Sequence, residues 1–294
     1  MKGKTIIAVD LGGTNVRTGK VQEHRILKSH SRPIPAQGSE EDVFNEIVEE
    51  VRRLFDDEVV AIGIGVPSVV DVEKGIVFNV HNIPSWKEVP LKEKLENIFS
   101  VPVYVNNDAN CFVLGELHFG KGKGFRNVTG LTLGTGLGGG VVIDGKLYSG
   151  TNCGAGEIGM IPYKNQILEY YCSGSFFTRE FGVSGEIVFQ RAREGDLAAV
   201  SAYNKFGTEM ALAICIVLYA YDPQLIILGG SVSKAFSLFQ TAMMSRLKEL
   251  FSYHHVLERL KIEISELPDV ALLGGAALYL DALKKHQSPI HPAK

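Results

Sequence analysis

The stretch TIIAVDLGGTNVRTGKV (residues 5–21) places two runs of apolar and β-branched residues on either side of a glycine pair. This pattern predicts a strand, a tight turn and a returning strand. It occurs again in NVTGLTLGTGLGGGVVID (residues 127–144), where we expect a glycine turn at Gly134–Gly140 and a returning strand at 141–144. Because the two copies lie about half a chain apart, they indicate two related halves and not a short-period solenoid.

The sequence around these two hairpins predicts alternating strands and helices. Ser39, followed three residues later by Asp42, is typical of a helix start, and the apolar run Val59–Val66 is typical of a strand covered on both faces. Other strands are predicted at 25–35, 101–105, 225–228 and 261–266, and other helices at 91–99, 109–119, 197–221, 235–251 and 271–284. This mixture predicts an α/β fold.

The composition is that of an ordinary globular protein. Of 294 residues, 45% are hydrophobic and 21% are charged, and the net charge of −3 argues against a nucleic-acid partner. No apolar run has the length of a membrane helix, and Ile6–Val9 is too short for the core of a signal peptide. The four cysteines lie far apart without a CxxC pair, which favours reduced thiols. We therefore expect a cytoplasmic protein that binds neither nucleic acid nor membrane.

The glycine turns are candidate phosphate sites, because glycine lets the backbone approach an anion and direct amide hydrogens at it. In the first turn we expect Gly12, Gly13 and the Thr14 hydroxyl to bind phosphate, and Asp10 to hold Mg²⁺ through water. The second turn is neither a P-loop nor a Rossmann loop, since no Gly-Lys-Ser/Thr and no helix follows it. The nucleotide-binding residues expected in the second half are Gly134, Thr135, Gly136, Gly138, Gly139, Gly229 and Gly230.

The dipeptide Asn107-Asp108 stands where a predicted strand ends and a predicted helix begins. A carboxylate at such a strand end lies at the edge of the sheet where α/β proteins bind ligands. Phosphoryl transfer to a hydroxyl needs an oriented carboxylate to accept the proton. Asp108 is therefore the candidate general base, although an aspartate there could also be a plain helix N-cap.

Five motifs together resemble the ROK family of sugar kinases. They are DLGGTN (10–15), NNDAN (106–110), GTGLGGG (134–140), GAGEIG (154–159) and LGG (228–230). They stand in the family's order and spacing, and the resemblance covers nearly the whole chain, from about Ile6 to Leu280.

The resemblance implies two ribonuclease-H-like lobes, of the actin and hexokinase type, around a cleft that holds a hexose and MgATP. We expect an N-terminal lobe of residues 1–115, with the final helix (about 275–294) packed back on it, and a C-terminal lobe of residues 116–274. The resemblance implies that Asp108 deprotonates the sugar 6-hydroxyl. The residues that it implies for sugar binding are Asn82, Asn107, Asp108, Glu157 and Glu169.

The chain departs from the family where the family usually binds zinc. The family's histidine is replaced by Met160, and the segment Pro162–Leu168 lacks the usual cysteines, while Cys172 comes too late to be one of them. Since a structural zinc site needs thiolates and imidazole, we expect no zinc.

Glucose is the expected acceptor because it is the family's commonest substrate. N-acetylmannosamine, N-acetylglucosamine, allose and fructose remain open, since sequence does not show how single hydroxyl groups are distinguished. A sugar-sensing regulator is a second reading, but the family's repressors carry an extra N-terminal helix-turn-helix and this chain begins at the first strand. A third reading is a non-sugar kinase or ATPase of the same superfamily, against which NNDAN and GAGEIG argue. The family is often dimeric or tetrameric, so a homodimer is one expectation.

Overall fold

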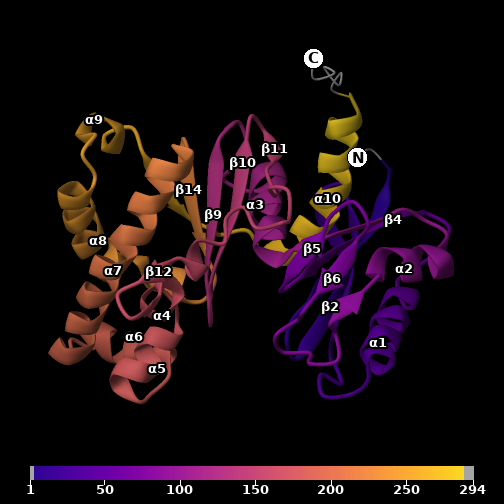
Figure 1. Ribbon diagram of the computed structural model, residues 1–294, viewed down its shortest axis with the longest axis horizontal. Coiled ribbons are helices and arrows are strands. Elements are labelled where there is room, and N and C mark those ends of the chain that lie inside the picture. Colours follow the sequence, from indigo (N-terminus) through magenta and orange to yellow (C-terminus); the bar gives the residue numbers. More distant parts are fainter. Residues whose placement is uncertain (1–2, 288–294) are drawn as a thin grey trace. The chain divides into compact units, whose positions relative to one another are not determined.

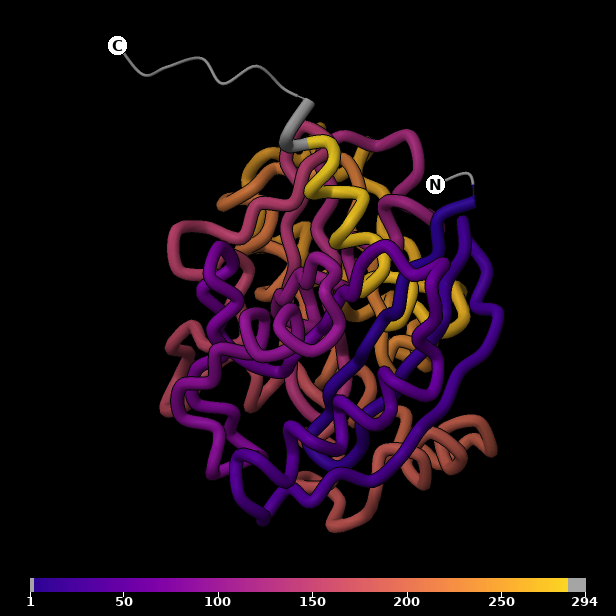
Figure 2. Tube along the Cα trace, turned by 90° about the vertical axis from the view of Figure 1, so that its right-hand side faces the viewer, coloured from indigo at the N-terminus to yellow at the C-terminus, as the bar shows by residue number. Residues whose placement is uncertain are grey.

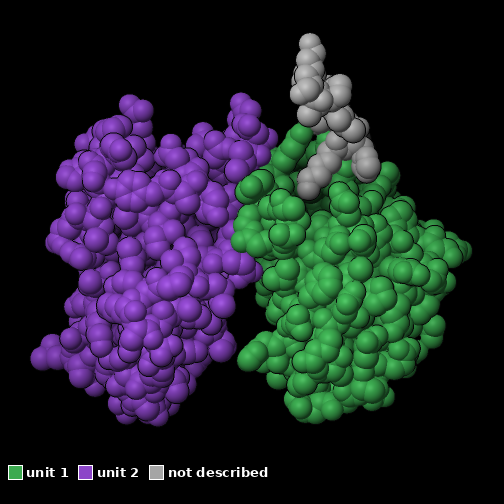
Figure 3. Space-filling view, in the orientation of Figure 1, with its two compact units in different colours: residues 1–123, 145–155, 267–294 green, residues 124–144, 156–266 purple. Residues whose placement is uncertain are grey.

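The computed structural model describes residues 3–287 and separates into two compact units, which Figure 3 shows in green and purple. Unit 1 comprises residues 1–123, 145–155 and 267–294, and unit 2 comprises residues 124–144 and 156–266. The lobe boundary expected between residues 115 and 116 stays a prediction, and one helix, α3 (Asp108–Phe119), runs across that position. The end of the predicted final helix, beyond residue 287, lies outside the described residues.

Unit 1 is built on a five-stranded sheet in the order β3-β2-β1-β4-β8, labelled in part in Figure 1. β1 and β2 form the predicted antiparallel hairpin, while β4 and β8 run parallel to β1. The strands of unit 1 are β1 (Thr5–Leu11), β2 (Asn15–Gln22), β3 (Arg25–Pro33), β4 (Val59–Val66), β5 (Val69–Asp71), β6 (Ile76–Phe78), β7 (Glu88–Val89), β8 (Val103–Asn107) and β11 (Lys146–Leu147). Its helices are α1 (Glu40–Arg52), α2 (Leu91–Phe99), α3 and α10 (Val270–Gln287).

The last helix, α10, packs on the sheet of unit 1 although it is far from that sheet in sequence. In Figure 2 its yellow tube runs beside the indigo N-terminal strands, and Leu272 and Ala276 join Ile6 and Ala8 in one buried cluster. The approach is close enough that a Cβ at Gly63 of β4 would lie 2.0 Å from the carbonyl oxygen of Gly275. Glycine at this crossing therefore lets the helix lie directly on the strand.

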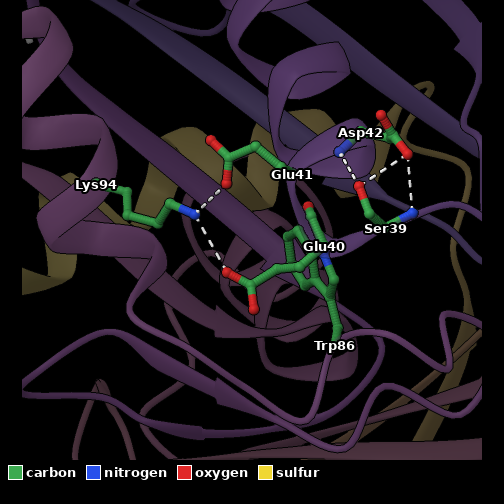
Figure 4. Close-up of polar contacts among 6 residues, drawn as sticks. All are labelled: Ser39, Glu40, Glu41, Asp42, Trp86 and Lys94. Atoms are coloured by element: carbon green, nitrogen blue, oxygen red, sulfur yellow. Dashed lines mark hydrogen bonds and ion pairs between the residues drawn. The ribbon is translucent and has the colours of Figure 1, made fainter.

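The start of α1 confirms the helix signal read from Ser39. The Ser39 hydroxyl accepts a hydrogen bond from the Asp42 amide, and the Asp42 carboxylate accepts one from the Ser39 amide, so that the two form a capping box (Figure 4). The same helix end holds a distant loop, because the Trp86 indole donates to the Glu40 carbonyl oxygen at 3.3 Å. Lys94 of α2 pairs with the Glu40 and Glu41 carboxylates at 3.1 and 2.9 Å.

Four strands of unit 2 stand in one sheet in the order β10-β9-β14-β15, which repeats the order of β2-β1-β4-β8 in unit 1. β9 and β10 are antiparallel, and β14 runs parallel to both β9 and β15. The strands of unit 2 are β9 (Val128–Leu133), β10 (Leu137–Ile143), β12 (Pro162–Tyr163), β13 (Gln166–Ile167), β14 (Leu225–Gly229) and β15 (Lys261–Ile264). Its helical segments are η1 (Ile158–Met160), α4 (Leu168–Cys172), α5 (Ser175–Phe181), α6 (Gly185–Arg193), α7 (Leu197–Tyr221), η2 (Val232–Ala235), α8 (Phe236–Leu250) and α9 (His254–Leu257).

The core of unit 2 lies around α7, whose bounds match the predicted 197–221. Phe206 and Met210 of this helix are fully buried, as are Phe239 and Met243 of α8. The two helices touch backbone to backbone at Gly207, where a Cβ would stand 2.4 Å from the carbonyl oxygen of Phe239. Within residues 3–287, none of the helices has the length and hydrophobicity needed to cross a bilayer.

Among the predicted boundaries that were wrong, two bear on the candidate site. β10 begins at Leu137, so Gly138–Gly140 are strand residues and the second glycine turn is confined to Gly134–Gly136. The physical reason is a close approach: a Cβ at Gly139 would lie 2.4 Å from the carbonyl oxygen of Gly156, so this strand needs glycine where another segment covers it. β8 runs over Val103–Asn107 and not 101–105, which makes Asn107 the last strand residue.

Candidate active site

The first glycine turn connects β1 to β2 and lies against the loop that carries Asn82. Gly12 closes the turn by donating its amide to the Asn15 carbonyl oxygen at 2.8 Å, and Thr14 is exposed beside it. A Cβ at Gly13 would lie 2.6 Å from the side-chain nitrogen of Asn82, Nδ2, and 2.8 Å from the Cβ of the same residue. The structure thus brings together the predicted phosphate turn and the predicted sugar loop of unit 1, which are far apart in sequence.

The Asn82 loop is fixed by the two apolar residues that flank it. Ile83 and Trp86 are fully buried in the core of unit 1, and the Trp86 amide donates to the Ile83 carbonyl oxygen at 2.9 Å. The indole hydrogen bond to Glu40 holds the same loop from the side of α1. Asn82 is therefore an exposed amide on a loop with buried anchors, which is a suitable arrangement for a binding residue.

Asp10 is the last residue but one of β1, next to the first turn. Burial raises the pKa of its carboxyl group above the ordinary value, and the nearby Arg17 guanidinium lowers this pKa in part. A carboxylate that has lost solvent gains from a nearby divalent cation, and Mg²⁺ prefers oxygen ligands of this kind. Asp10 therefore fits a role in holding Mg²⁺.

Asn107 and Asp108 both accept hydrogen bonds at the start of α3. Asn107 is the N-cap of α3, since its side-chain oxygen accepts from the amides of Ala109 at 2.9 Å and Asn110 at 3.4 Å. Asp108 is the first helical residue and is exposed, whereas Asn107 and Ala109 are buried. The Asp108 carboxylate itself accepts the Ala109 amide at 2.8 Å. These hydrogen bonds orient Asp108, which is an exposed residue.

A buried amide network that the sequence did not reveal supports this strand end. Asn106 accepts hydrogen bonds from the Asn107 amide and the Asn110 side chain, both at 2.9 Å, and from the Cys153 thiol at 3.4 Å. The Asn107 side chain also donates to the Ser68 carbonyl oxygen at 3.3 Å. These bonds fix β8 where Asp108 follows, and the predicted sugar contact of Asn107 stays a prediction.

The two predicted glutamates of unit 2 meet near the second glycine turn. The Glu169 carboxylate accepts the Leu137 amide at 2.8 Å, and a Cβ at Gly136 would lie 2.4 Å from that carboxylate. Partial burial raises the pKa of the Glu157 carboxyl group, and the negative charge of Glu169 raises it further. The structure thus brings a pair of like-charged acceptors to the turn, and sugar hydroxyls are donors that could lie between such acceptors.

Two glycines of the GAGEIG segment, Gly156 and Gly159, pack directly on the backbone of β10. Gly156 has a φ of +94°, and a Cβ there would stand 2.4 Å from the carbonyl oxygen of Gly139. A Cβ at Gly159 would stand 2.3 Å from the carbonyl oxygen of Leu137. These contacts place Glu157 over the hairpin that bears the glycine turn, and they explain why glycines flank it.

Unit 2 also contains a pocket of about 370 Å³ beside the second turn. This volume is in the range of small-molecule sites. Gly134 and Thr135 line the pocket, and the turn is held there because the Gly174 amide donates to the Gly134 carbonyl oxygen and the Ser175 hydroxyl donates to the Thr135 carbonyl oxygen, both at 2.7 Å. The pocket is a candidate nucleotide site.

Several pocket residues were missed by sequence reasoning, namely Thr178, Glu186, Phe189, Tyr203 and Lys234. Burial and the Glu186 charge raise the pKa of Tyr203 to about 12, so its hydroxyl stays a hydrogen-bond donor. The predicted Gly229 and Gly230 lie directly before Ser231 and do not themselves line the pocket. Gly230 has a φ of +85° and a Cβ there would be 2.4 Å from the Leu133 carbonyl oxygen, so this glycine serves the turn from β14 into η2.

The residues where the family would bind zinc do not fit that metal. Met160 is 58% exposed, and the hairpin β12–β13 that follows offers neither imidazole nor thiolate. Among the described residues, no three His, Cys, Asp or Glu side chains gather in a way that could hold a metal ion. The expectation that the protein binds no zinc stays a prediction.

Comparisons with known proteins agree with these features. The ROK family model matches residues 6–282. The chain is 34% identical to the glucokinase of Thermotoga maritima over 78% of this chain and 83% of that protein. It is 29% identical to the N-acetyl-D-glucosamine kinase of Vibrio parahaemolyticus over 81% of this chain and 87% of that protein.

The chain is also similar to solved structures of ROK family proteins. The crystal structure of a ROK family glucokinase from Streptomyces griseus in complex with glucose and AMPPNP has a TM-score of 0.79 and 29% sequence identity. The match covers 93% of this chain and 98% of that chain. The predicted fold class, α/β of the two-lobed kind found in ROK kinases, is confirmed.

Proposed function

The chain belongs to the ROK family, and we propose that this sugar kinase transfers the terminal phosphoryl group of ATP to the 6-hydroxyl of a hexose, with glucose as the preferred acceptor. The glucokinases of Thermotoga maritima and Streptomyces griseus support glucose, and the AMPPNP bound to the latter supports ATP as donor. The Vibrio kinase supports N-acetylglucosamine as the second candidate acceptor.

The observation that carries the proposal is the position of Asp108, exposed at the first residue of α3 and oriented by the Asn107 cap. In the proposed reaction the Asp108 carboxylate takes the proton of the 6-hydroxyl while the hydroxyl oxygen forms a bond to the terminal phosphorus. The bond between that phosphorus and the oxygen of the leaving ADP breaks in the same step. Such general-base assistance contributes roughly 10²- to 10⁴-fold to a rate.

The remaining site residues are assigned by their surroundings. In unit 1, Asn82 and Asn107 are proposed to bind sugar hydroxyls, and Asp10 with the Gly12–Thr14 turn is proposed to bind Mg²⁺ and phosphate. Mg²⁺ would neutralise charge on the phosphates, which the reaction requires. In unit 2, Glu157 and Glu169 supply acceptors for sugar hydroxyls. The turn Gly134–Gly136 and the adjoining pocket are proposed to bind the nucleotide.

The test of the base is the Asp108→Asn variant, which keeps the size of the side chain and removes its basicity. We expect kcat with glucose to fall roughly 10³-fold because the 6-hydroxyl proton has no acceptor. Glucose binding should persist, and the single tryptophan, Trp86, provides a fluorescence readout near Asn82. Asp144→Asn is the matched control, since Asp144 is an exposed residue of unit 2 that pairs with Arg126. Near-normal turnover of Asp108→Asn would eliminate Asp108 as the base.

The acceptor is decided by the ratio of kcat/KM for glucose to kcat/KM for N-acetylglucosamine. A ratio above one supports glucose, and a ratio below one supports the second candidate.

A homodimer and a cytoplasmic location also stay predictions.

A further inference from the structure

Lys164 lies at the tip of the hairpin β12–β13, at the centre of a small cluster of polar and aromatic groups. Its ammonium nitrogen is 2.6 Å from the Glu209 carboxylate on α7. The same nitrogen lies 4.8 Å from the ring centre of Tyr163 and 4.7 Å from that of Tyr171. Lys164 thus joins three segments of unit 2: the hairpin, α4 through Tyr171, and α7 through Glu209.

The cluster is partly shielded from solvent, so its contacts are stronger than those of an exposed ion pair. The Glu209 side chain is only 9% exposed, whereas that of Lys164 is 46% exposed. Burial lowers the pKa of the Lys164 ammonium, but the hydrogen bonds and charges of Glu209 and Tyr163 together raise this pKa overall. The two tyrosine rings pack edge to face with their centres 5.2 Å apart, and the Tyr171 hydroxyl donates to Asn165 at 2.5 Å.

The backbone at Lys164 indicates that the side chain matters at this position. Its φ is +54°, in the left-handed region that glycine or asparagine adopts with less strain. A glycine would relieve the backbone but would remove the ammonium group that meets Glu209 and both rings. The contacts of the side chain therefore compensate for a turn that lysine does not favour.

The helix that this cluster holds, α4, cannot set its own position. It spans five residues, Leu168–Cys172, and its N-cap makes no side-chain hydrogen bond. So short a helix has no independent stability and depends on its packing. Leu168 and Cys172 are buried in the core on one face, and Tyr171 meets the Lys164 cluster on another.

The same helix carries Glu169, whose carboxylate accepts the Leu137 amide of β10 at 2.8 Å. Glu169 stands two residues from Tyr171, so any shift of α4 against α7 moves this carboxylate relative to the second glycine turn. A displacement of about 1 Å at a reacting or binding group can cost a hundredfold in rate.

We propose that Lys164 is a positioning residue that, by joining Glu209 of α7 to Tyr171 of α4, holds Glu169 in place for sugar binding. The hairpin that carries it stands where the family's metal ligands are missing, and the cluster fixes α4 without a metal. This inference rests on the proposed function, because it concerns the sugar contact of Glu169.

The kinetic test is the Lys164→Met variant, which keeps the length of the side chain and removes its charge. We expect the KM for glucose to rise about tenfold, while kcat and the KM for ATP stay within about twofold of the wild-type values. The reason is that Glu169 loses its position for sugar binding, whereas the position of the general base, Asp108, does not change. Glu209→Gln should give the same pattern. Lys164→Arg should restore most of the glucose affinity, since a guanidinium can also pair with a carboxylate and stack on a ring.

The matched control is Lys205→Met. Lys205 is likewise a lysine of unit 2 that pairs with a glutamate, Glu180, and lies over a ring, that of Phe176, at 5.6 Å. It makes these contacts with α5 and not with α4, so its replacement should leave the KM for glucose unchanged. Equal effects of both methionine variants would mean a general loss of stability and would overturn the proposal.

A second measurement does not depend on turnover. Amide hydrogen exchange of the intact protein should be at least about tenfold faster in Lys164→Met than in Lys205→Met, both at Leu137 and in residues 168–172. The reason is that the Leu137 amide no longer donates its hydrogen bond to the Glu169 carboxylate. Unchanged exchange would refute the positioning role. If the wild type phosphorylates no sugar, the proposed function fails, and the exchange result still decides whether Lys164 holds Glu169.

Discussion

The turn between β1 and β2 and the turn between β9 and β10 have the same sequence pattern but are held differently. In unit 1, the glycine at the turn faces a whole side chain, because a Cβ on Gly13 would lie 2.6 Å from the Nδ2 atom of Asn82 and 2.8 Å from its Cβ. In unit 2, the glycine faces the far end of a side chain, because a Cβ on Gly136 would meet the carboxylate oxygen of Glu169 at 2.4 Å.

The two contacts differ in how easily the side chain can move away from the turn. Rotation about the Asn82 side-chain bonds cannot move its Cβ away, so anything added to Gly13 must displace the loop that Ile83 and Trp86 anchor in the core. Glu169 can swing its carboxylate aside, but it then gives up the Leu137 amide. Each unit therefore joins a glycine turn to a candidate sugar-binding residue. Unit 1 does so by rigid packing against Asn82, and unit 2 does so by a hydrogen bond to Glu169.

The largest effect should come from Gly13→Ala. Because the anchored Asn82 loop must shift, we expect kcat/KM for glucose to fall roughly a hundredfold. The measurement is steady-state turnover together with thermal unfolding. Gly154→Ala is the control, since a Cβ there meets nothing within 4 Å. If Gly13→Ala behaved like this control, the packing of Asn82 on the first turn would have no functional meaning.

A smaller effect is expected from Gly136→Ala. The Glu169 carboxylate should rotate away from the new methyl group and lose one charge-assisted hydrogen bond, which raises the KM for glucose about tenfold. Steady-state kinetics on the same sugar measure this change. An effect equal to or larger than that of Gly13→Ala would reverse the order of stiffness that distinguishes the two turns.

The sequence predicted the parts of this fold whose signals are local. The β1–β2 hairpin and α1 with its Ser39 cap were predicted because each is defined by a pattern within a few neighbouring residues. α7 was predicted to the residue because 25 consecutive residues keep the helical pattern. The candidate base was found in the same way, from a strand end followed directly by a helix.

The features that were missed depend on contacts between distant segments. Gly138 was expected in the second turn, because sequence alone cannot distinguish a glycine that binds a ligand from one in a strand beneath another segment. The pocket residues on α5–α7, such as Tyr203, carry no pattern that sets them apart from ordinary helix residues. In the Lys164 cluster the hydrogen bond to Glu209 joins residues 45 positions apart, so no local sequence pattern predicts it.

The most direct test of the sugar kinase assignment is ADP release with MgATP across a panel of hexoses and N-acetylhexosamines, with and without a zinc chelator. We expect higher turnover on glucose than on the other sugars and no effect of the chelator. Absence of turnover on every sugar would contradict the assignment of this chain as a hexose kinase, and loss of turnover with the chelator would contradict the expected absence of zinc.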